Sequence, residues 1–98
     1  MKIDIPDQSN VVDHYGPSAQ AYVHMEELAE LIQMISKMRR YSGECDYPPD
    51  AFYNLVGEVA DVLVSIEQIK LIYGIPDDFL QEMILMKCAR QEKRMLEE

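Results

Sequence analysis

Apolar residues recur every three or four positions along most of this chain, which is the period of an amphipathic α-helix. The pattern predicts four helices, at about 6–14, 18–40, 49–73 and from 76 onward. Prolines and glycines stand at their borders, where a helix can begin or end. No segment alternates with the period of two that a half-buried strand requires. We therefore expect an all-α helical bundle with two long central helices and a short N-terminal helix.

Each long helix carries one wide apolar stripe, and we expect the stripes to meet in the core. The stripe of the second predicted helix is Met25, Leu28, Leu31, Ile32, Ile35 and Met38. That of the third is Phe52, Leu55, Val59, Val62, Leu63, Ile66 and Ile69. The last helix offers Phe79, Leu80, Met83, Ile84 and Met95. Because a single domain of 98 residues buries only a modest core, we expect a homodimer or homotetramer to complete the bundle.

Composition narrows the classes of function. Hydrophobic residues make up 48% of the chain, which argues against disorder, and the net charge of −9 disfavours binding to nucleic acids or anionic membranes. No apolar run approaches the roughly 18 residues of a membrane span, and the first residues lack an apolar signal core. The two cysteines, Cys45 and Cys88, are far apart and fit a reduced compartment. These features predict a cytoplasmic protein.

Two acidic signatures lie inside the apolar helical runs. The first is Glu26-Glu27-Leu28-Ala29-Glu30 and the second is Glu58-Val59-Ala60-Asp61. A spacing of three places Glu27 with Glu30, and Glu58 with Asp61, on one helix face at the edge of a stripe. A single such pair is ordinarily solvated, but two pairs on adjacent helices would meet at a seam. Clustered carboxylates repel unless a cation joins them, so the pattern predicts an all-oxygen Mg²⁺ or Mn²⁺ site.

These motifs resemble the MazG-like nucleotide pyrophosphohydrolases of the all-α NTP pyrophosphatase superfamily, especially small phage-type and prophage-type members. That family shows Glu-Glu-x-x-Glu followed by Glu-x-x-Asp. It often adds Lys-x-x-Arg on the last helix, which Lys87-Cys88-Ala89-Arg90 matches. Many members carry an asparagine two residues before that lysine, and Leu85 stands there in this chain. The resemblance covers roughly residues 15–94.

The resemblance implies hydrolysis of a nucleoside triphosphate to its monophosphate and pyrophosphate. Glu27, Glu30, Glu58 and Asp61 would hold Mg²⁺, and Glu26 or Glu27 would orient the attacking water or take its proton. The pair Lys87 and Arg90 would neutralise the triphosphate, either from the same chain or from a neighbouring subunit. Two alternatives remain open. One is a non-catalytic nucleotide- or protein-binding module of the same fold, and the other is a phosphoribosyl-ATP pyrophosphatase.

Two further residues allow more than one interpretation. His24 lies three residues before Glu27 and is either an extra ligand or, as we favour, an ordinary surface or interface histidine. Lys70 falls in the apolar sector of its helix, where we favour a side chain lying along apolar surface over one that faces an acid or a phosphate.

Overall fold

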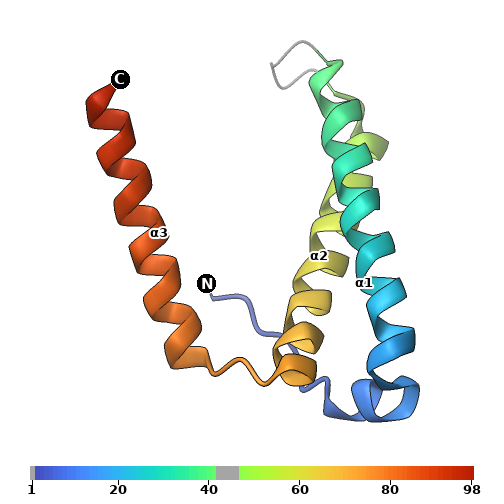
Figure 1. Cartoon of the computed structure of the whole chain (residues 1–98). Helices are drawn as coiled ribbons and strands as arrows, with labels where there is room; N and C mark the ends of the chain where they lie inside the picture. Colours follow the sequence, from blue (N-terminus) through green and yellow to red (C-terminus); the bar gives the residue numbers. More distant parts are fainter. Residues whose placement is uncertain (1, 42–46) are drawn as a thin grey trace.

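The computed structural model describes residues 2–41 and 47–98, which form three helices and, within those ranges, no strand. They are α1 (Ser9–Arg39), α2 (Pro49–Tyr73) and α3 (Asp77–Glu97), joined in that order (Figure 1). The expected all-α class is therefore confirmed. None of the helices in this part of the chain is both long and apolar enough to span a bilayer.

The predicted short N-terminal helix and the second predicted helix are one element with a kink. Helix α1 begins at Ser9 and not near Pro6, where the sequence predicted its start. At this start the Asp7 carboxylate accepts hydrogen bonds from the Ser9 backbone N–H (3.1 Å) and from the Ser9 hydroxyl (2.7 Å). At Gly16 the backbone leaves the helical region, with φ 83° and ψ 162°. A positive φ suits glycine, and Pro17 then starts the longer segment because it needs no N–H partner there. The sequence located the break correctly, but the two segments are not separated by a loop.

The ends of α2 follow the predicted proline and glycine signals. Pro49 occupies the first turn, behind Pro48 in an extended conformation. Gly74 ends the helix in the left-handed conformation (φ 65°), and the next N–H, of Ile75, donates to the Lys70 carbonyl at 2.9 Å. Residues 42–46 are not among the described residues. Most of the predicted loop before α2 therefore lies outside them, and so does Cys45.

Helices α1 and α2 run antiparallel and pack side by side, whereas α3 packs against neither of them among the described residues (Figure 1). Lys70 stabilises the turn between α2 and α3, because its Nζ forms ion pairs with Glu67 (2.9 Å) and Asp77 (2.6 Å). These hydrogen bonds raise the pKa of Lys70. Our favoured interpretation, a Lys70 side chain lying along apolar surface, is therefore wrong, and Lys70 faces two acids as the alternative predicted.

The predicted apolar stripes form only part of the contact between α1 and α2. The residues that α1 buries are Gln20, His24 and Met34, and those that α2 buries are Ala51, Val62, Ser65 and Gln68. Stripe residues of α1 such as Ile32 (68% exposed) and Ile35 (50%) face outward instead. The two helices thus meet along a seam of mixed polar and apolar side chains and leave much of their apolar surface uncovered within the chain.

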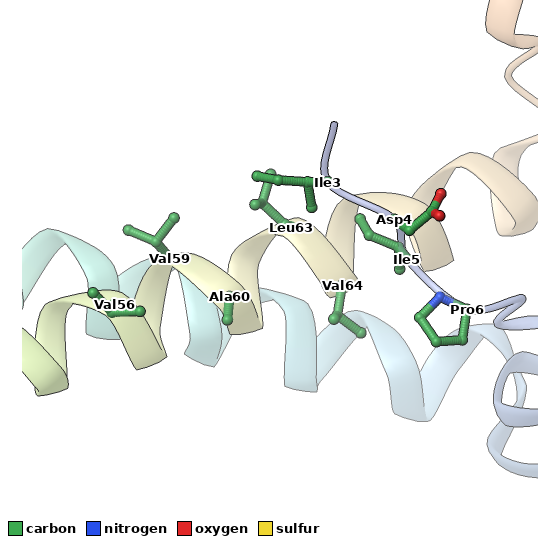
Figure 2. A pocket seen from close by; sticks show the side chains of 9 residues that line it. All are labelled: Ile3, Asp4, Ile5, Pro6, Val56, Val59, Ala60, Leu63 and Val64. Atoms are coloured by element: carbon green, nitrogen blue, oxygen red, sulfur yellow. The ribbon is translucent and has the colours of Figure 1, made fainter. Parts of the chain in front are cut away.

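The segment before α1 has no regular secondary structure and runs beside α2. Figure 2 shows Ile3, Ile5 and Pro6 beside an apolar patch of α2 that includes Leu63 and Val64. Segment and helix frame an open apolar pocket of about 300 Å³. The N-terminal segment therefore covers part of the outer face of α2 but does not fill it.

Candidate metal centre

Four carboxylates from α1 and α2 converge at one point of the seam. Glu27 and Glu30 come from α1, Glu58 and Asp61 from α2, and one oxygen of each lies within 4.8 Å of those of the others. On each helix the spacing of three places the pair one turn apart on the same face. The packing of α1 against α2 then brings the two pairs opposite each other. The expected convergence of the two acidic motifs is confirmed, and we call these four residues the acidic cluster.

The cluster has an inner and an outer half. Glu27 and Glu58 are half-buried, whereas Glu30 and Asp61 are exposed. One oxygen on each inner residue, Glu27 Oε2 and Glu58 Oε2, is shielded from solvent and has no hydrogen-bond partner. Because a shielded, unpartnered carboxylate oxygen is costly, these two atoms call for a cation or a proton.

The ionisation of the inner glutamates reflects this crowding. Burial, followed by the negative charges of Asp61 and Glu30, raises the pKa of Glu27 to about 7. Burial, followed by the charge of Glu30, also raises the pKa of Glu58. A carboxylate disfavours its charged form when it loses water or faces like charges. Near neutral pH the metal-free cluster therefore retains a proton on Glu27 for a substantial part of the time.

The donor set fits a hard divalent cation. All four side chains offer oxygen, the ligand that Mg²⁺ and Mn²⁺ prefer. Within the described ranges no lysine or arginine forms an ion pair with these four acids, and the ion pairs present are those of Lys70 at the distant turn. The repulsion in the cluster is thus not neutralised by the chain's own basic side chains.

The other residues expected at the site lie apart from the cluster. Glu26 is exposed on α1 and does not belong to the converging group. Lys87 and Arg90 are exposed on α3, where they line a shallow cavity of about 390 Å³ together with Gln91 and Arg94. Since α3 packs against neither α1 nor α2, the chain alone does not bring these cations to the acidic cluster.

Sequence reasoning missed the polar continuation of the seam beyond the cluster. His24 Nε2 donates a hydrogen bond to Gln68 Oε1 (2.8 Å), and Gln68 Nε2 donates to Gln8 Oε1 (3.0 Å). Gln20 is also buried, and its Oε1 has no partner. His24 is therefore buried at the interface between α1 and α2, as the interface interpretation predicted, and it is not among the converging acids. The signal was present as Gln20, His24 and Glu27, which share one helix face at i, i+4 and i+7.

Comparison of the chain with models of known protein families, with curated proteins and with solved structures finds no match. The geometry of the acidic cluster and the motifs of the sequence are thus the basis for the functional proposal that follows.

Proposed function

We propose that this chain is a divalent-cation-dependent nucleoside triphosphate pyrophosphohydrolase, which releases a nucleoside monophosphate and pyrophosphate. The observation that carries the proposal is the acidic cluster: four carboxylate oxygens within 4.8 Å of one another, two of the residues having a shielded and unpartnered oxygen. The cluster is built from the two motifs that resemble those of the MazG-like family.

In this proposal Glu27, Glu30, Glu58 and Asp61 hold Mg²⁺ or Mn²⁺. Such an ion, when bound, polarises phosphate oxygens and lowers the pKa of a coordinated water. The exposed half of the cluster, Glu30 and Asp61, faces the side from which a triphosphate approaches. The half-buried pair fixes the geometry, because the packing of α1 on α2 sets its separation.

We assign proton transfer to Glu27 in preference to Glu26. A general base must lie within hydrogen-bond reach of the attacking water, which calls for a carboxylate inside the cluster that the metal does not fully occupy. Glu27 lies within the cluster, half-buried beside the other three acids, whereas Glu26 lies outside it. The water oxygen bonds to the α-phosphorus, its proton passes to the carboxylate, and the bond from that phosphorus to the bridging oxygen breaks to release pyrophosphate.

Product analysis tests the proposal. Purified protein is incubated with Mg²⁺ and a panel of canonical and modified nucleoside triphosphates, and the phosphorus products are identified by ³¹P NMR. We expect monophosphate and pyrophosphate, absent in Asp61→Asn and retained in Asp13→Asn, a matched change at an exposed aspartate outside the cluster. Diphosphate and phosphate as products would contradict the proposed bond cleavage.

The same panel separates the alternatives. Turnover of phosphoribosyl-ATP alone would identify the related pyrophosphatase activity. No product from any substrate, with a folded and metal-binding protein, would favour a non-catalytic binding module.

A further inference from the structure

A pocket distinct from the one in Figure 2 lies at the seam between α1 and α2, close to the kink at Gly16. Its volume is about 410 Å³, and its lining combines apolar side chains with one tyrosine and two glutamines: Val11, Tyr15, Ala19, Gln20, Val23 and Gln68. We call these six residues the glutamine pocket. Both the volume and the mixture of apolar walls with a few polar groups are typical of sites for small organic molecules.

Gln20 is the glutamine of this pocket whose hydrogen bonding is incomplete. It is only 4% exposed, and its Oε1 is shielded from solvent and has no partner among the described residues. The amide of Gln68 differs, because it accepts from His24 and donates to Gln8. A buried amide oxygen without a donor is costly. The Gln20 side chain therefore calls for a molecule in the pocket that donates a hydrogen bond.

The glutamine pocket and the exposed half of the acidic cluster lie on one side of the helix pair. At about 100° per residue, Val23 and Glu30 of α1 fall within about 20° of each other, and so do Gln68 and Asp61 of α2. Each pair is separated by seven positions, which corresponds to about 10 Å along the helix. A ribose and a metal-bound phosphate together bridge a gap of this order. One nucleotide can thus reach from the cluster into the pocket.

The chemistry of the pocket fits a nucleobase. An amide places a donor beside an acceptor, and it pairs with the edge of a base that offers the opposite arrangement, as glutamine does with adenine. Tyr15 is 61% exposed at the pocket and offers a ring on which a base stacks. Val11 and Val23 supply apolar walls. The lining contains neither lysine nor arginine, which disfavours a phosphate as the group bound there.

From these observations we infer that the glutamine pocket binds the base of the substrate, with Gln20 pairing to its hydrogen-bonding edge and Tyr15 stacking on its ring. The inference rests on the proposed function for the identity of the substrate, but binding of the base requires neither the metal nor hydrolysis. A base that presents an N–H to Gln20 Oε1 satisfies the shielded oxygen. Selectivity follows, because a base without a donor at that position leaves the oxygen unpaired in the complex.

Nucleoside titrations followed by NMR test the inference without metal or turnover. The ¹⁵N-labelled wild-type protein is titrated, in the presence of a chelator, with adenosine, guanosine, cytidine, uridine and thymidine, and with ribose as a control that lacks a base. The side-chain amide signals of Gln20 should shift and saturate with at least one nucleoside and stay in place with ribose.

The outcomes separate this inference from the proposed function. If no nucleoside moves the Gln20 signals, or if ribose moves them equally, the inference is overturned even where the protein hydrolyses nucleoside triphosphates. Saturation by a nucleoside in a protein that hydrolyses none of them would support base binding and contradict the proposed hydrolysis alone.

Two pairs of matched variants locate the site. Gln20→Leu should weaken binding of the preferred nucleoside about tenfold, whereas Gln33→Leu, the same change at an exposed glutamine of α1, should leave it unchanged. Tyr15→Leu should weaken it by a similar factor, and Tyr22→Leu, at an exposed tyrosine outside the pocket, should not.

Stability provides the second readout. Gln20→Leu should not lower the free energy of unfolding in urea, because Gln20 Oε1 has no partner to lose among the described residues. If this variant loses stability and binds the nucleoside as before, the amide is structural and the inference is wrong. Should Gln20→Leu not fold, the titration of the wild-type protein decides alone.

Discussion

Replacing Glu27 by glutamine should stabilise the metal-free protein at high pH. The change keeps the size of the side chain and removes its charge from the crowded half of the acidic cluster. The pKa of Glu27 is raised from 4.5 to about 7, and one pKa unit corresponds to about 1.4 kcal/mol. The full shift amounts to about 3 kcal/mol above pH 7, which solvent screening at a half-buried site reduces to about 1–2 kcal/mol.

The sign follows from proton binding. The folded protein holds a proton on Glu27 more tightly than the unfolded chain does, so the wild-type free energy of unfolding should fall as pH rises from about 4.5 to about 7. Glu27→Gln removes this loss. The stabilising effect should therefore be about a quarter of its full size at pH 5 and almost fully present at pH 8.

Urea unfolding in the presence of a chelator measures the free energy of unfolding of the wild-type protein and of Glu27→Gln at each pH. The protein concentration is kept fixed, because assembly also contributes to stability. Glu92→Gln, a matched change at an exposed glutamate of α3, should show no such difference between the two pH values. If Glu27→Gln instead destabilises the protein equally at pH 5 and pH 8, Glu27 is a structural side chain and the electrostatic argument is wrong.

Four further outcomes follow from the site and its surroundings. Glu30→Gln and Asp61→Asn should each abolish turnover and also the thermal stabilisation that Mg²⁺ provides, while the metal-free protein still folds. If the metal-free variants do not fold, these acids have a structural role. Calorimetry should find Mg²⁺ affinity about tenfold higher at pH 8 than at pH 6, because binding must displace the Glu27 proton, and a flat profile would refute this. His24→Leu should cost about 1–3 kcal/mol in urea unfolding by leaving the Gln68 oxygen unpaired, without changing Mg²⁺ affinity; a loss of affinity would place His24 among the ligands. Mixing inactive Lys87→Ala and Asp61→Asn chains should restore pyrophosphate release, whereas no recovery after verified subunit exchange would place both groups in one chain.

The sequence predicted the convergence of the acidic cluster because two independent regularities agreed. Each acid pair has a spacing of three, and each lies at the edge of an apolar stripe. Helix geometry turns such a pattern into a position on the helix surface. The ends of α2 were predictable for a similar local reason, since Pro49 and Gly74 restrict the backbone at single positions.

The orientation of the stripes was not predictable in the same way. A stripe containing Ile32 and Ile35 shows that a face needs covering, but periodicity does not reveal whether the cover is a helix of the same chain. The polar residues His24 and Gln68 face each other because hydrogen bonding satisfies both when they are buried. That pairing joins positions 44 residues apart, and no local pattern reports it.

Binding of Mn²⁺ to the purified protein at pH 8, followed by electron paramagnetic resonance, tests most directly whether the acidic cluster holds a divalent cation. We predict saturable binding in the wild-type protein and in Asp13→Asn, and its loss in Asp61→Asn. Equal binding by all three proteins, or none by the wild-type protein, would contradict the assignment of Glu27, Glu30, Glu58 and Asp61 as a metal site.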